Sequence, residues 1–126
     1  GHRVPDHASL CKNLHGHRYV LEVELCDRVV HEAGNHENGM VKDFGALKQA
    51  MLKAIVDWDH SFMVFYRDPW LPVLQQLDTK LTIVDFVPTA EKIAADLFIR
   101  VQSFLNVVVK RVTVWETPTC KAIVEH

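Results

Sequence analysis

Histidines crowd the start of the chain. The 126-residue sequence has eight histidines, and His2, His7, His15 and His17 fall at its beginning. Residues two apart on a strand project to the same side, so the imidazoles of His15 and His17 would point together. Imidazole suits zinc, and a catalytic zinc keeps three protein ligands and one open position. Spacing alone leaves the third ligand open: His2 and His7 are near in sequence, and His60 is distant.

The chain has three cysteines and no C-x-x-C pair. Cys11 lies four residues before His15, where zinc and histidines would favour its reactive thiolate as base or nucleophile. The same thiol could instead be a fourth zinc ligand, or a buried, inert side chain. Cys26 and Cys120 are expected to be buried and inert. Without a disulfide framework, unpaired thiols favour a reducing, cytoplasmic setting.

Three acidic positions could take part in chemistry. Asp59 precedes His60, and such a carboxylate can orient an imidazole for proton transfer, although a solvated pair at a helix end is the plainer alternative. Glu116 ends an apolar strand, where it either meets water or accepts two hydrogen bonds from an N–H pair of a guanine or pterin ring. Glu91 falls in the first turn of an expected helix, which the helix dipole alone explains.

The hydrophobic pattern indicates the elements that must position these groups. Residues 15–26 alternate with period two and predict a half-buried strand, which could run on to residue 31. Glycine–asparagine turns between 33 and 39 precede a helix over 44–58 capped by Asp43. A second helix is predicted over 89–104, with Thr89 as its N-cap. Strands over 107–116 and 120–125 follow.

Each expected helix carries an apolar stripe that should be buried. The stripe residues are Leu47, Met51, Ile55 and Trp58 in the first helix, and Ile93, Leu97, Val101 and Phe104 in the second. Between the helices, the pattern predicts a loop around 66–72, a short helix over 70–77 and a β-like run over 80–86. Strands at both ends and helices in the middle predict an α+β fold, with the helices on one face of an antiparallel sheet.

Composition excludes several classes of partner. Fourteen basic and sixteen acidic side chains give a net charge of −2, so nucleic acid and anionic membranes are not expected partners. No apolar run approaches the roughly 18 residues of a membrane span. The length fits one domain over residues 1–126.

Five short motifs occur in order along the chain. They are C-x-x-x-H-G-H at 11–17, G-M-V-x-D-F at 39–44, D-H at 59–60, P-T-A-E at 88–91 and E-T-P at 116–118. Together with the G-H-R-V-P start, this set resembles the 6-pyruvoyl-tetrahydropterin synthase family over nearly the whole chain. Three residues separate Cys11 from His15, which is similar to the queuosine-pathway branch, the 6-carboxy-tetrahydropterin synthases.

The resemblance implies a fold and an assembly. Members adopt the tunnelling fold, in which sheets of several subunits close one β-barrel, most often as a hexamer of two trimers with active sites at subunit interfaces. The family normally has a strand before its first zinc histidine, so we expect that strand upstream of residue 1. The segment 62–87 is longer than in the shortest members, and the resemblance gives it no function.

The resemblance also implies roles for nine residues. His2, His15 and His17 would hold zinc, Cys11 would be the thiol base, Asp59 and His60 would complete a proton relay, Glu116 would anchor the pterin, and Thr89 and Glu91 would line its pocket. The implied substrate is 7,8-dihydroneopterin triphosphate, and the implied products are 6-carboxy-tetrahydropterin, acetaldehyde and triphosphate. The cation that binds the triphosphate is open among Lys12, Arg3, Arg18, Lys42 and residues of another subunit.

Three alternatives compete with this interpretation, two of them enzymes and one a non-catalytic module. A 6-pyruvoyl-tetrahydropterin synthase would eliminate triphosphate without cleaving a carbon–carbon bond. The aldolase-like branch typically has Glu at the catalytic position, so Cys11 argues against it. A non-catalytic zinc or pterin-binding module is an alternative of another class.

Overall fold

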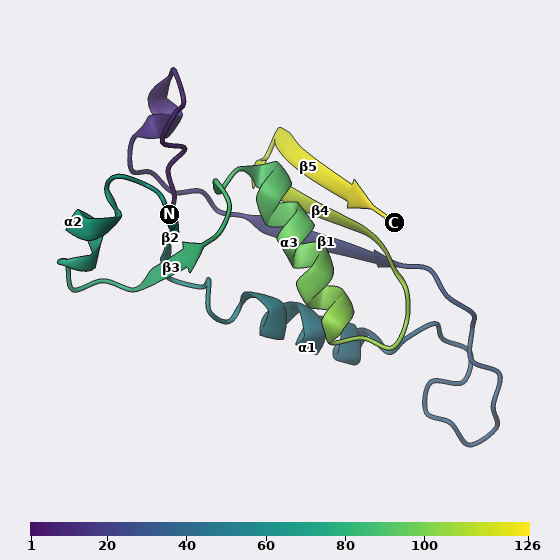
Figure 1. Ribbon diagram of the computed structural model, residues 1–126. Coiled ribbons are helices and arrows are strands. Elements are labelled where there is room, and N and C mark those ends of the chain that lie inside the picture. Colours follow the sequence, from purple (N-terminus) through teal and green to yellow (C-terminus); the bar gives the residue numbers. More distant parts are fainter.

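The main sheet has three antiparallel strands. The computed structural model describes residues 1–126, and its strands β1 (Val20–Leu25), β4 (Val109–Thr117) and β5 (Cys120–Glu125) pair in the order β1-β4-β5. Helix α3 (Ala90–Ser103) lies across this sheet, and α1 (Phe44–Ile55) packs beside α3 (Figure 1). The predicted α+β architecture with an antiparallel sheet is confirmed.

A smaller sheet was not predicted. Strands β2 (Phe62–Phe65) and β3 (Leu81–Val84) pair in parallel, and the short helix α2 (Leu71–Gln75) lies between them in sequence. The short helix and β3 match the expected pattern, but β2 is a four-residue apolar run without alternation. Periodicity gives no signal for such a run. None of the helices combines the length and apolarity needed to cross a lipid bilayer.

The first predicted strand is shorter than expected. Regular pairing of β1 with β4 starts at Val20, whereas His15 has only an isolated bridge to His2. The extension to residue 31 is wrong, because the chain leaves the sheet after Cys26 donates its N–H to the carbonyl of Val108. The glycine turns are confirmed: Gly34 and Gly39 have φ of 86° and 89°, the left-handed region that glycine tolerates.

Both predicted helix caps are present. Asp43 Oδ2 accepts the N–H of Ala46 at 3.0 Å, and Thr89 Oγ1 accepts the N–H of Lys92 at 3.3 Å. These side chains satisfy backbone donors that the first helical turn leaves free. The first helix ends at Ile55 rather than at residue 58, and turns carry the chain from there into β2.

The core lies between α3 and the main sheet. Ile93, Leu97 and Val101 are buried as predicted, but Phe104 is the C-cap and is 49% exposed. The predicted stripe of the first helix is only half-buried. Its buried residues are Ala50 and Ala54 instead, because small side chains let the two helices approach closely.

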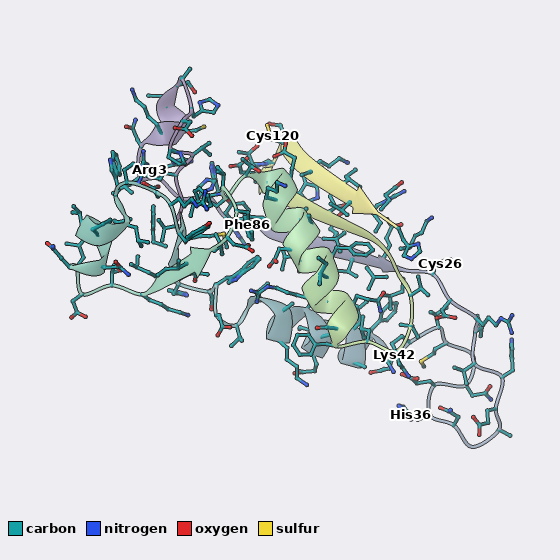
Figure 2. The ribbon with its side chains drawn as sticks, viewed as in Figure 1. Arg3, Cys26, His36, Lys42, Phe86 and Cys120 are labelled. Carbon is teal, nitrogen blue, oxygen red and sulfur yellow. The ribbon has the colours of Figure 1, made fainter.

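Two cysteines differ from expectation. Cys26 and Cys120 are both exposed, not buried, because each lies at the end of a strand where the sheet gives way to a turn or loop. Figure 2 shows them at opposite ends of the main sheet. All three cysteines are free thiols.

Candidate metal centre and active site

Three histidines from the predicted set converge with Glu116. One side-chain donor atom from each of His2, His15, His17 and Glu116 lies within 4.8 Å of the others. His2 is only 2% exposed. Cys11, His7 and His60 lie outside this group, so the geometry favours His2 among the candidates for the third ligand.

Backbone pairing places the histidines side by side. The N–H of His2 donates to the carbonyl of His15 at 2.8 Å, and the N–H of His15 donates back to the carbonyl of His2 at 3.2 Å. Residues paired in this way across antiparallel strands project to the same face. His17 follows two residues later on that face, and the centroids of the three rings are 4.5 to 5.2 Å apart.

Hydrogen bonds determine which ring nitrogen of two histidines is free. The Nδ1 atom of His2 lies 2.7 Å from the carbonyl of Pro88, and that of His15 lies 2.7 Å from the carbonyl of Asn13. A carbonyl only accepts, so each Nδ1 carries the proton and each neutral ring keeps a lone pair on Nε2. Metal-binding histidines are commonly oriented in this way.

The spacing of the donor atoms suits a small divalent cation. Glu116 Oε1 lies 3.0 Å from Nε2 of His17 and 3.4 Å from Nε2 of His2. Tetrahedral zinc with bonds of about 2.0 Å places its ligand atoms about 3.3 Å apart. Imidazole donors with one carboxylate fit zinc better than calcium or magnesium, which prefer oxygen ligands.

Tyr19 belongs to the same cluster and was not singled out as a functional residue. Its hydroxyl lies 3.2 Å from Nε2 of His2, and its ring meets that of His17 edge-on. Burial raises the pKa of Tyr19, so its hydroxyl stays protonated, whereas burial lowers the pKa of His2 and favours the neutral ring that a metal needs. The alternation through 15, 17 and 19 was the signal that could have identified it.

The Asp59–His60 pair lies on the surface. Asp59 Oδ1 is 3.0 Å from Nδ1 of His60, and the two side chains are 72% and 94% exposed. Lys80 Nζ donates to the carbonyl of Asp59 at 2.8 Å. His60 has φ of 51°, a left-handed conformation that is uncommon outside glycine and often marks a functional position.

One cavity extends from His2 and His17 to the Asp59–His60 pair. It encloses about 470 Å³, within the range of small-molecule sites, and His2, His17, Asp59 and His60 all line it. Its wall is completed largely by apolar side chains of β1, α1 and α3. The lining does not include His15, Cys11, Glu116, Thr89 or Glu91. A single chain therefore does not gather all the predicted site residues around one cavity.

Cys11, Thr89 and Glu91 lie close in sequence to residues that form or hold the histidine cluster. Cys11 is half-buried in a 3₁₀ turn, η1 (Leu10–Lys12), which ends three residues before His15. Thr89 and Glu91 begin α3, directly after the Pro88 carbonyl that holds His2. The hydroxyl of Thr89 accepts the N–H of Lys92 in the helix cap, and Glu91 is exposed.

The four candidate cations for the triphosphate differ in availability. Arg3 is 4% exposed and paired with buried Asp68, so it is not free to meet a ligand. Lys42 is 3.1 Å from Glu37. Lys12 is exposed beside Cys11, and Arg18 lines the cavity next to His17. Of these four side chains, Lys12 and Arg18 are therefore the two without an acidic partner.

Comparison with known proteins places the chain in one family. The family model for 6-pyruvoyl tetrahydropterin synthase matches residues 1–126. The 6-carboxy-5,6,7,8-tetrahydropterin synthase of Haemophilus influenzae is 35% identical over 123 residues, covering 94% of this chain and 86% of that protein. The Aquifex aeolicus protein of the same name is 36% identical over 124 residues, covering 89% and 74% respectively.

Solved structures share the fold. An uncharacterized protein from Wolinella succinogenes superimposes with a TM-score of 0.77 at 25% identity, over 100% of this chain and 92% of that one. The 6-pyruvoyl tetrahydropterin synthase of Caenorhabditis elegans gives a TM-score of 0.70 at 24% identity, over 99% and 86%. The fold is therefore the tunnelling fold, and the chain belongs to the 6-pyruvoyl tetrahydropterin synthase family.

Proposed function

We propose that this chain is a zinc-dependent enzyme that converts 7,8-dihydroneopterin triphosphate to 6-carboxy-tetrahydropterin, acetaldehyde and triphosphate, in the cytoplasm and on the route to queuosine. The observation that carries the proposal is the cluster of His2, His15 and His17, in which backbone carbonyls orient two rings toward a shared centre. Support for the substrate comes from relatives that bear the name 6-carboxy-tetrahydropterin synthase.

The three histidines would hold the zinc, with the carbonyls of Pro88 and Asn13 fixing the rings of His2 and His15. Bound zinc would polarise the hydroxyls of the substrate side chain and stabilise negative charge that develops on them. The neutral state of His2, favoured by its burial, keeps its Nε2 lone pair ready for the metal.

Proton transfer is assigned to Cys11 and the Asp59–His60 pair. Cys11 would take a proton from the substrate side chain as its thiolate. Asp59 accepts from Nδ1 of His60, which leaves Nε2 of that ring to exchange protons with the substrate. Because the His60 side chain is 94% exposed, we propose that a neighbouring subunit of a hexamer encloses it in the working enzyme.

Glu116 is assigned to the pterin ring, where its carboxylate would accept two N–H groups. In the structure this carboxylate lies against His17 and His2, which makes a metal-ligand role the direct competitor. Glu116→Gln separates the two. A pterin anchor predicts retained zinc and a KM raised about 10- to 100-fold, since a charge-assisted pair of hydrogen bonds is weakened. Loss of zinc from this variant would instead make Glu116 a ligand.

Product analysis tests the whole proposal. The zinc-loaded protein is incubated with 7,8-dihydroneopterin triphosphate, and acetaldehyde together with 6-carboxy-tetrahydropterin is the expected result. Accumulation of 6-pyruvoyl-tetrahydropterin would support the alternative that stops after triphosphate elimination. A Cys11→Ala variant should retain zinc and lose turnover. Zinc binding without any turnover of the triphosphate by the wild type would favour a non-catalytic module.

A further inference from the structure

A buried ion pair joins the N-terminal segment to the middle of the chain. The side chains of Arg3 and Asp68 are only 5% and 1% exposed, and Nη1 of Arg3 donates to Oδ1 of Asp68. Figure 2 shows Arg3 between the N-terminal loop and the α2 region. Burial of such a pair costs about as much as its attraction returns, so its presence says little about stability. The segments that the Arg3–Asp68 pair holds together are more informative.

The guanidinium of Arg3 touches three separate groups. Besides Asp68, its Nε donates to the carbonyl of Lys12 at 2.8 Å, and its central carbon lies 3.5 Å from the ring centroid of Trp70. Asp68 Oδ1 also accepts the N–H of Trp70 at 2.9 Å. Only a planar fork such as guanidinium can stack on a ring and donate in two directions at once. Arg3 therefore ties the Lys12 backbone to the segment 62–87.

The loop that carries Cys11, residues 5–14, has few other anchors. The turn η1 is three residues long and has no buried residue, Leu10 is 80% exposed, and Ser9 makes no side-chain cap. Short 3₁₀ turns have poor internal hydrogen-bond geometry. The other tie to this turn from outside the loop is the N–H of Val4, which donates to the carbonyl of Cys11 at 2.8 Å. Both ties come from residues that directly follow His2.

We propose that Arg3, held in place by Asp68 and Trp70, is a positioning residue that fixes the Cys11 loop relative to the histidine cluster. The inference rests on the proposed role of Cys11 as thiol base. It also gives the segment 62–87 a task, because that segment supplies the carboxylate and the ring that hold Arg3. A misplacement of about 1 Å in a reacting group can lower the rate about 100-fold.

Arg3→Lys is the test. Lysine keeps a positive charge facing Asp68, whose Oδ2 is buried without a hydrogen-bond partner, but it loses the Nε donor to Lys12. We expect kcat to fall about 10- to 100-fold while KM and bound zinc stay unchanged. Arg67→Lys is the matched control: Arg67 is an exposed arginine in the same segment, stacked on Tyr66, and its replacement should leave kcat unchanged.

A second readout needs no substrate. Alkylation by iodoacetamide, followed by mass spectrometry of each cysteine peptide, compares Cys11 with Cys26 and Cys120 as internal references. In zinc-loaded Arg3→Lys the relative rate at Cys11 should rise several-fold, and in Arg67→Lys it should not change. If wild type fails to turn over the triphosphate, the proposed function fails, while this ratio still tests whether Arg3 holds the loop.

Two results would overturn the inference. One is an unchanged Cys11 ratio and unchanged kcat in Arg3→Lys. The other is loss of zinc with an unchanged Cys11 ratio, which would mean that Arg3 serves the histidines instead. If Arg3→Lys does not fold, the double variant Arg3→Met with Asp68→Leu replaces the pair by apolar side chains, a change that proteins often tolerate. It also lacks the bond to Lys12, so the same rise at Cys11 is expected.

Discussion

His2 and His17 of the histidine cluster line the same cavity as the Asp59–His60 pair, but the two regions are built in opposite ways. His2 is buried, and its ring is held by a backbone carbonyl and surrounded by other rings. His60 is exposed, and its ring has only the neighbouring Asp59 as a polar partner. The proposed metal ligands are thus preorganised within one chain, whereas the proposed proton-transfer pair is presented outward.

The difference in burial between the histidine cluster and the Asp59–His60 pair follows from the role proposed for each. A metal site needs several donors within one bond length of a common point, which requires fixed backbone and oriented rings. An acid–base pair needs reach and correct geometry with the substrate, and its surroundings can be completed by a partner or by the substrate itself. His60 also has a φ of 51°, a strained backbone conformation that persists only where the surrounding structure holds it.

The largest effect is expected from removal of a proposed zinc ligand. His15→Ala should abolish turnover and lower the affinity for zinc. The loss of affinity should exceed the roughly 10- to 100-fold drop that follows when a ligand merely loses its hydrogen-bond partner. Metal analysis after dialysis measures this loss. His7→Ala is the control, since His7 is exposed and its ring bonds only to Ser9. Full zinc occupancy in His15→Ala would refute the assignment.

Removal of the exposed imidazole should affect catalysis and leave the metal in place. His60→Ala is expected to lower kcat by about 10²- to 10⁴-fold with unchanged zinc, because a general acid–base group is lost. His60→Gly should be equally inactive but more stable than His60→Ala by about 1 kcal/mol, since glycine adopts positive φ without strain. Urea unfolding compares the two. Equal stability would show that the turn at residue 60 relaxes.

Low pH should destabilise the metal-free protein through buried His2. Burial lowers the pKa of His2 below its ordinary value of 6.5. Below about pH 6.5, His2 therefore becomes protonated in the unfolded chain while it stays neutral in the folded chain. The stability of the metal-free protein should therefore fall as pH drops below about 6.5, and this loss should level off below the folded-state pKa. Urea unfolding across this range measures the slope, and His2→Gln should remove that part of it.

The smallest effect is expected at the start of α3, beside the carbonyl that holds His2. Thr89→Ala removes the helix cap and should lower the free energy of unfolding by about 1 kcal/mol, whereas Thr89→Ser keeps an oxygen for the bond to the N–H of Lys92. If Thr89 also lines the pterin pocket, Thr89→Ala should raise KM more than Thr89→Ser does. Equal KM values would remove Thr89 from the pocket.

Local features were predictable because their causes are local. Asp43 and Thr89 cap helices since a short oxygen-bearing side chain satisfies nearby N–H groups whatever the rest of the fold does. The pair His15 and His17 was found by the same reasoning, as alternation on an extended chain needs no tertiary information. Strand β2 was missed because a short, fully apolar run has no periodicity to detect.

The sequence by itself determined the residue types for a zinc site, the helix caps, the order of the elements apart from β2 and, through its motifs, the family. Residue spacing left the third ligand open and only the family motifs pointed to His2, whereas the tertiary structure shows why it joins His15 and His17: a backbone bridge pairs His2 with His15. The tertiary structure alone placed Glu116 against the rings of His2 and His17 and buried Arg3 on Asp68. Such contacts join residues from 13 to 114 positions apart in the chain, and only packing and burial select them.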